Sequence, residues 1–263
     1  MPHPLLRLAF AAVCGVCLAP GLTDAQQTKT ATNGRYYAYD QHVPPGVAGT
    51  MAVNAGKVAP HTVQAVRIHL PTTGTVSFFD GSPDRPVSLA APAQAGVIVG
   101  PLYRLKLSDL PEFPNQEFYP SIELVDRLHP PPGQAERFPV EIEFDDKELA
   151  WAASGRMVTR VVYLEQPDRV PLQHLRGEPR VVDLAPFQNA VAEADLLGRP
   201  IAIVRLGGRT PDPHFPDPQF WGALAPVVVS RPAQPGDESM TRSPWPTRAG
   251  HSPGAIRPTS VLR

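Results

Sequence analysis

The stretch YPSIELVDRLHPPPGQAERFPVEIEF, residues 119–144, decides the fold class. Apolar and acidic residues alternate in IEL at 122–124 and again in VEIEF at 140–144. Such alternation is typical of a strand with one face in a core and the other in solvent. The stretch therefore predicts two β-strands, one on each side of a proline triplet.

The triplet at residues 130–132 predicts a stiff connector, because proline fixes its own φ angle and restricts the residue before it. Gly133 then lets the chain turn without steric cost. We expect a hairpin joint between the two strands. The alternative is a working loop whose rigid tip, with His129 on one side and Arg137 on the other, docks into an aromatic groove of a partner.

Four further segments read as strands: HTVQAVRIHL (61–70), GTVSFFDG (74–81), VIVGPLYRLKLSDL (97–110) and RMVTRVVYLE (156–165). The last is apolar on both faces apart from Arg160, which is typical of a central strand. A charge in that position needs a partner, and Asp126 is the residue expected to supply it. Together the segments predict a mainly β protein, with an immunoglobulin-like or related β-sandwich.

Two short helices are expected among these strands. In DDKELAWAASG (145–155), Asp145 is the N-cap, Glu148 completes a capping box and Gly155 ends the helix. In APFQNAVAEADLLGRP (185–200), Pro186 suits the first turn and Gly198 the end. This second helix stands between VVD (181–183) and IAIVRL (201–206), which could form a crossover unit. An α+β fold with a small mixed sheet is therefore the alternative.

The ends of the chain differ from its middle in composition. Residues 1–25 have the layout of a secretory signal peptide, in which Arg7 precedes a short apolar run and small residues follow it. We expect a disordered leader arm at 26–57, a β-rich globular domain at 58–206 and a proline-rich, largely disordered tail at 207–263. The signal predicts a secreted or periplasmic, extracytoplasmic location.

Composition excludes several kinds of chemistry. Both cysteines, Cys14 and Cys17, lie inside the predicted signal, so a mature chain has no disulfide, cysteine-ligated metal or cysteine nucleophile. The net charge is -1, and loss of Arg7 and Asp24 with the signal leaves it unchanged. Without a basic excess we expect no nucleic-acid partner. We also expect no membrane-spanning segment after signal cleavage, and no cofactor.

The sequence lacks the motifs GxSxG, GxxxxGK, GxGxxG and HExxH, so we assign no catalytic residue and no metal ligand from it. Four residues are candidates for ligand binding: Glu141, Glu143, His129 and Trp221. Glu141 and Glu143 share one strand face with Asp145. We interpret this row as a solvated face ending in a helix cap, with calcium binding or acid–base work as the alternative.

The segment PDPHFPDPQFW, residues 211–221, also carries two interpretations. Asp212, His214 and Asp217 could converge on a metal such as zinc or manganese. Each of them stands beside proline, however, in a stretch that lacks the supporting contacts metal ligands need. We therefore expect an aromatic loop that docks back on the domain and presents Trp221.

Five runs resemble a family of exported bacterial cell-envelope proteins with no assigned activity: GPLYRLKLSDLPEFP, YPSIELVDRLHPPPG, RFPVEIEF, ELAWAASGRMVTRVVYLE and GRPIAIVRLGGR. The resemblance covers residues 100–209. It implies an envelope or extracellular location and offers no catalytic residue to carry over.

The function expected from these features is a non-catalytic, secreted or periplasmic binding or structural module of the cell envelope. Its partner would be an envelope protein or a saccharide. The alternative is a hydrolase acting on envelope polymers, with carboxylates drawn from Glu141, Glu143, Asp126 and Glu165. That enzyme would need two carboxyl groups facing each other across a cleft. The sequence makes no prediction of the oligomeric state.

Overall fold

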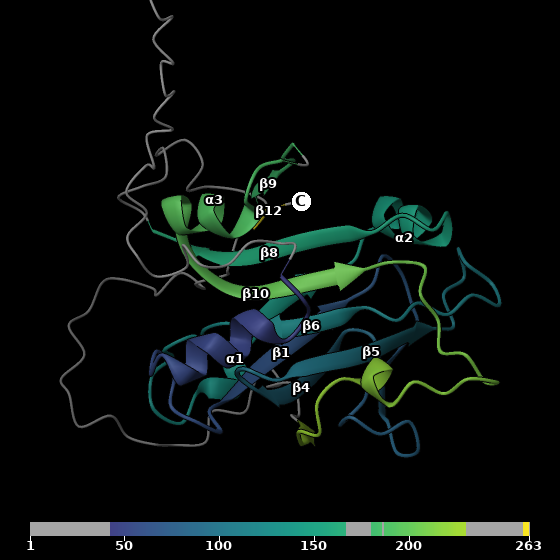
Figure 1. The fold of residues 1–263 in the computed structure, drawn as a ribbon, viewed down its shortest axis with the longest axis horizontal. Coiled ribbons are helices and arrows are strands. Elements are labelled where there is room, and N and C mark those ends of the chain that lie inside the picture. The colour runs from purple at the N-terminus through teal and green to yellow at the C-terminus, as the bar shows by residue number, and fades with distance from the viewer. Residues whose placement is uncertain (1–42, 167–179, 186, 230–259, 263) are drawn as a thin grey trace, which may run out of the picture. The chain divides into compact units, whose positions relative to one another are not determined.

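The computed structural model describes residues 43–166, 180–185, 187–229 and 260–262. The predicted signal peptide and most of the predicted arm and tail lie outside these residues. Within them the protein is mainly β, with two sheets and three α-helices, as the alternating segments predicted (Figure 1). None of the helices in these residues is long and apolar enough to cross a membrane.

The smaller sheet has the strand order β11, β4, β1, β7. Its strands are β1 (Val63–His69), β4 (Ala93–Ile98), β7 (Val140–Glu143) and β11 (Val227–Val229). β1 pairs antiparallel with β4 and parallel with β7. β4 was not predicted as a separate strand, because its sequence AQAGVI is buried throughout and carries no alternation of apolar and charged residues.

The larger sheet has eight strands in the order β3, β2, β5, β6, β10, β8, β12, β9. Their bounds are β3 (Val87–Ala90), β2 (Thr75–Phe78), β5 (Leu102–Ser108), β6 (Ser121–Leu124), β10 (Gly198–Leu206), β8 (Val158–Glu165), β12 (Ser260–Leu262) and β9 (Arg180–Val182). Neighbours pair antiparallel except β12 and β9, which are parallel. Helix α3 (Ala190–Leu197) connects β9 to β10 within this one sheet, so the crossover anticipated from the sequence exists, with β8 and β12 between its strands.

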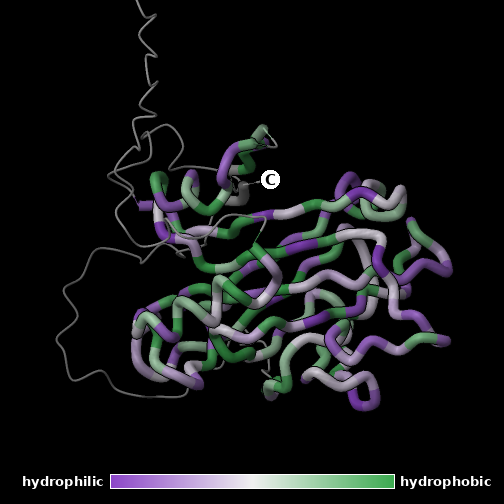
Figure 2. Tube along the Cα trace, in the orientation of Figure 1, coloured by the Kyte–Doolittle hydropathy of each residue, from purple (hydrophilic) through white to green (hydrophobic). Residues whose placement is uncertain are grey.

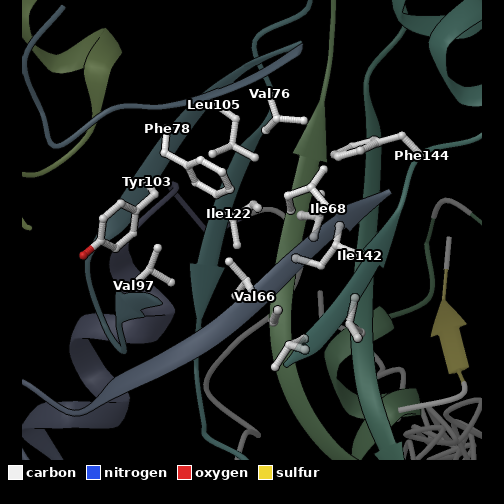
Figure 3. Close-up of a cluster of buried hydrophobic side chains, with 14 of the residues drawn as sticks. Val66, Ile68, Val76, Phe78, Val97, Tyr103, Leu105, Ile122, Ile142 and Phe144 are labelled. Carbon is white, nitrogen blue, oxygen red and sulfur yellow. The ribbon is translucent and has the colours of Figure 1, made fainter. Parts of the chain in front are cut away.

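Side chains from both sheets meet in one hydrophobic core, which makes the fold a β-sandwich. Val66 and Ile68 of the smaller sheet lie against Phe78, Leu105 and Ile122 of the larger one (Figure 3). Each side chain of this size contributes about 1.5–3 kcal/mol when fully buried. Hydrophobic residues gather along the strands, whereas the connecting loops are more hydrophilic (Figure 2). Each sheet contains one parallel pair of strands, whereas an immunoglobulin domain is built from two antiparallel sheets.

A second hydrophobic cluster lies on the outer face of the larger sheet. Helices α1 (Val47–Asn54) and α3 cover this face (Figure 1). The cluster consists of Ala48, Val125, Val161, Tyr163, Ala190, Val191, Ala194 and Ile203. The larger sheet is therefore buried on both faces along β8 and β10.

The packed part of the chain extends beyond residues 58–206 at both ends. α1 lies within the predicted arm, and β11 lies within the predicted tail. α1 packs through the small residues Ala48, Gly49 and Ala52 rather than through an amphipathic face. A Cβ atom at Gly49 would meet the Gly100 carbonyl oxygen at 2.4 Å, so the close approach of α1 requires glycine there. Contacts of this kind leave no periodic signal in a sequence.

Helix α2 (Asp146–Ala153) begins and ends as predicted. Asp145 is the N-cap, and its carboxylate accepts a hydrogen bond from the Glu148 backbone N–H at 2.8 Å. The Glu148 carboxylate in turn accepts one from the Asp145 backbone N–H, which completes the capping box. Gly155 follows the helix with φ +83°. The local rules for helix ends therefore sufficed here.

Two predictions about the opening stretch are wrong. β6 belongs to the larger sheet and β7 to the smaller one. The segment with the proline triplet therefore carries the chain from one sheet to the other and is not a hairpin joint. Alternation shows which residues face a core, but it is identical for strands on either side of that core.

The predicted ion pair between Arg160 and Asp126 is the second error. Arg160 pairs with Glu148, and the charged group that lies 3.6 Å from Asp126 is Arg199.

Candidate binding site

An aromatic turn on the outer face of the larger sheet presents the predicted Trp221. The turn is a short 3-10 helix, Pro218–Trp221, and Asp217 caps it by accepting a hydrogen bond from the Gln219 N–H at 2.9 Å. Gly222 follows with φ +89° and ψ -159°, a conformation open essentially only to glycine. Ala223 N–H then donates to the Leu102 carbonyl of β5 at 3.0 Å. The turn is thus fixed to the edge of the strand beneath it.

Trp221 is half-buried in an aromatic cluster. Its ring lies 4.5 Å from the Phe79 ring, 5.1 Å from Phe220 and 6.1 Å from Tyr119, measured between ring centroids. Tilted and edge-to-face pairs of this kind contribute about 0.5–1.5 kcal/mol each beyond their buried area. The segment therefore docks back on the domain, as expected, and holds the tryptophan in a fixed orientation.

Two guanidinium groups lie against Phe220. Arg104 of β5 lies 4.5 Å from the centre of that ring and donates to the backbone carbonyls of Phe220, at 2.8 Å, and Tyr119, at 2.9 Å. Arg209 lies 5.3 Å from the same ring and forms a 2.7 Å ion pair with Asp217. Burial, with a smaller contribution from Arg209, lowers the pKa of Arg104 to about 10. Arg104 consequently serves to hold the turn, whereas the Arg209 side chain is 63% exposed.

A groove of about 360 Å³ runs beside this cluster. It is lined by Pro83, Arg209, Thr210, Pro211, Asp212, Pro213, Phe215, Pro216, Asp217, Phe220 and Trp221. Phe215 is 80% exposed, although it is a large apolar residue. A mainly apolar groove with a few polar groups at its rim is the usual form of a binding site.

The metal interpretation of the same segment gains no geometric support. Asp212 accepts hydrogen bonds from the backbone N–H groups of His214 and Phe215, at 2.8 and 3.2 Å. Asp217 is engaged by Gln219 and Arg209. The described part of the chain contains no group of three or more His, Cys, Asp or Glu residues placed to hold a metal. These carboxylates instead shape the turns that form the groove.

Glu141 and Glu143 do lie on one face of β7, the outer face of the smaller sheet. Glu141 forms a 3.0 Å ion pair with Arg67 and lies 2.8 Å from the His69 ring. Arg67 also donates to Gln94 on the neighbouring strand. Glu143 is exposed, and within the described residues its carboxylate makes no hydrogen bond or ion pair. Two carboxylates in a row on one strand do not face each other across a cleft, which is what glycoside hydrolysis requires.

His129 is exposed at the start of the proline triplet. Its Nδ1 atom lies 3.3 Å from the Arg199 guanidinium of β10. Its pKa is lowered, first by partial burial and then by Arg199 and Arg127. His129, the Glu141 row and Trp221 belong to three separate surfaces, so the structure does not unite the four predicted residues in one site.

Sequence reasoning missed three residues around Trp221. Pro83 lines the groove from the loop between β2 and β3. Phe79 and Tyr119 do not line the groove, but their buried rings pack against Trp221 from different parts of the chain. No spacing in the sequence links these positions. Phe215 and Phe220 could be found, because they stand in the same short segment as the tryptophan.

Replacing Gly222 with alanine should lower the free energy of unfolding by more than the roughly 1–3 kcal/mol typical of backbone strain alone. The added Cβ would meet the Leu102 carbonyl oxygen at 2.4 Å and push the aromatic turn off β5. Gly133→Ala is the matched control, because Gly133 also has a positive φ, +75°, but no atom within 4 Å of the added carbon. Urea unfolding measures the free energy of unfolding of both variants. An equal loss in Gly222→Ala and Gly133→Ala would show that the contact of the turn with Leu102 does not contribute to stability.

Comparisons of the chain with protein-family models, with curated proteins and with solved structures found no match. The resemblance to exported bacterial envelope proteins stays a prediction.

Proposed function

We propose that this protein is a non-catalytic binding module of the cell envelope and that the groove beside Trp221 is its binding surface. The observation that carries the proposal is an exposed aromatic side chain, Phe215, beside a half-buried, fixed Trp221 in an apolar groove. Rigid aromatic rings bind with little loss of conformational entropy, since they are already held in place. The secreted or periplasmic location belongs to the same proposal and rests on the sequence of residues 1–25.

A saccharide is the partner that suits this groove best. The apolar faces of sugar rings pack on aromatic rings, while their hydroxyl groups need hydrogen-bonding groups at the rim. Arg209, Asp217 and Thr210 supply such groups beside Phe215 and Trp221. The hydrolase alternative has no comparable support, because Glu141 is already engaged by Arg67 and His69.

Thermal unfolding against a panel of peptidoglycan fragments and neutral oligosaccharides tests the proposal. A saccharide that binds only the folded protein must raise the unfolding midpoint with its concentration. Phe215→Ala should abolish that rise and leave the midpoint of the free protein nearly unchanged, because the side chain is 80% exposed. The matched control is Phe187→Ala, which removes a phenylalanine that is 88% exposed outside the groove.

Two results would contradict the proposal. The first is a flat midpoint across the whole panel. The second is a rise that Phe215→Ala and Phe187→Ala leave equally intact, since the saccharide would then bind elsewhere.

A further inference from the structure

A second groove, of about 290 Å³, lies between the beginning of β1 and the proline triplet. Its lining consists of Val63, Gln64, Ala65, Arg127, Leu128, His129, Pro130, Pro131, Pro132, Gly133 and Ala135. It shares no lining residue with the groove beside Trp221. One wall is therefore a strand, and the other is the stiff crossover between the two sheets.

Two buried glutamines hold this crossover against the smaller sheet. Gln64 of β1 accepts a hydrogen bond from the Leu128 N–H at 2.8 Å and is 5% exposed. Gln94 of β4 donates to the Glu136 carbonyl at 2.9 Å and is 1% exposed. Both ends of the crossover are thus anchored, and the prolines between them have fixed φ angles. The groove is preformed, which reduces the ordering cost of binding.

Positive charge gathers at the rim of this groove. Arg199 donates to the Arg127 carbonyl at 3.0 Å and lies 3.3 Å from His129 Nδ1. Asp126 lies 3.6 Å from Arg199, and its other carboxylate oxygen accepts the Arg127 backbone N–H at 2.7 Å. Arg127, Arg199 and Asp126 all interact electrostatically with His129. Two positive charges therefore stand beside one negative charge at this rim.

The Arg127 guanidinium is the group best placed for a ligand. Its side chain is exposed, and among the described residues it forms no ion pair and donates no hydrogen bond. Its planar fork matches a carboxylate or a phosphate through two parallel hydrogen bonds. Val63, 49% exposed, and the proline triplet add an apolar wall beside this charge.

We propose that this groove binds an oxyanion, a carboxylate or a phosphate, carried on a small molecule with an apolar face. Arg127 binds the oxyanion directly, and the nearby Arg199 guanidinium adds positive potential. The apolar part of the ligand packs on Val63 and the proline wall. This site is independent of the proposed saccharide groove and stands if that groove proves empty.

Isothermal titration of the Phe215→Ala variant, in which the groove beside Trp221 lacks its exposed aromatic ring, tests the site with three probes: glucuronate, inorganic phosphate and neutral glucose. Binding of either anion, weakened by added salt and absent for glucose, is the expected result. Arg127→Ala should weaken anion binding roughly tenfold or more, because a charge-assisted hydrogen bond is lost. Arg156→Ala is the matched control, since Arg156 is also exposed and lies outside the groove lining.

The two anions separate the possible sources of the ligand. Binding of glucuronate alone supports a carboxylated sugar, and binding of phosphate alone supports a phosphorylated ligand. The site is refuted if neither anion binds at millimolar concentration, if glucose binds as well as glucuronate, or if Arg127→Ala and Arg156→Ala bind equally. A failure of the saccharide panel would not change any of these results.

Discussion

Replacing Glu148 with alanine is expected to lower the free energy of unfolding by about 3–5 kcal/mol, the usual cost of leaving one member of a buried ion pair alone. Glu148 is 0% exposed and its partner Arg160 is 3% exposed, with 3.2 Å between their charged atoms. Arg160 projects from β8 into the space between the sheets, where its guanidinium lies 5.0 Å from the centre of the Phe144 ring. Without the carboxylate, a positive charge would remain in an apolar core.

Removing both charges should restore much of that stability. In the double variant Glu148→Leu with Arg160→Met, apolar side chains fill the space and no charge is buried, and such exchanges are often neutral or stabilising. Some loss remains, since Glu148 also completes the capping box of α2. Urea unfolding of the single and double variants measures the difference. A double variant as unstable as Glu148→Ala would show that packing, not charge, dominates at this position.

Replacing Glu123 with alanine is the second large effect expected, again about 3–5 kcal/mol. Glu123 is 0% exposed although it points away from the main core. One carboxylate oxygen lies 3.0 Å from Arg205, and the other accepts the Gly49 N–H of α1 at 2.7 Å. Arg205 in turn donates to the Val43 carbonyl at 3.1 Å. The pair therefore fastens the first turn of α1 to the larger sheet.

The loss of stability in Glu123→Ala should be accompanied by detachment of α1 from the larger sheet. Gly46, the N-cap of this helix, has no side chain that could accept a hydrogen bond from the first turn. The Glu123 carboxylate accepts the Gly49 N–H in its place. Hydrogen exchange should become faster in Val47–Asn54 than in β10 of the same variant. Glu123→Gln should lose less stability than Glu123→Ala, because an amide oxygen still accepts the Gly49 N–H.

Lys106→Ala provides the surface comparison for both variants. Lys106 and Glu117 form a 3.0 Å pair whose side chains are 28% and 46% exposed. Such pairs contribute about 0–1 kcal/mol, because solvent screens them and side-chain entropy opposes them. If Glu123→Ala cost no more than Lys106→Ala, or if α1 kept its protection, the anchoring role of Glu123 would be wrong.

Much of the secondary structure could be predicted because its signals are local. The segment HTVQAVRIHL (61–70) was predicted as a strand from its alternation, and the structure confirms β1 there, with Val66 and Ile68 in the core and Arg67 partly exposed between them. The missed elements lack such signals: β4 is buried throughout, and α1 packs through small residues.

The candidate sites were predictable only in part. Trp221 and its neighbour Phe220 stand in one conspicuous segment, so the aromatic loop could be found from the sequence. Pro83 completes the groove from a distant loop. Arg199 contacts His129 although the two residues are 70 positions apart in the sequence. No periodicity relates positions separated in this way, so neither contact could be anticipated.

The sequence by itself determined which side of each alternating strand faces a core and where α2 begins, because these depend on sterics and hydrogen bonds between near neighbours. Only the tertiary structure decided that β6 and β7 lie in different sheets, and that Arg160 pairs with Glu148. It also decided that Glu123, on a strand face that reads as solvent-exposed, is buried beneath α1. The reason is that a period of two is the same on either sheet, whereas the partner of a buried charge is set by whichever distant segment packs over it.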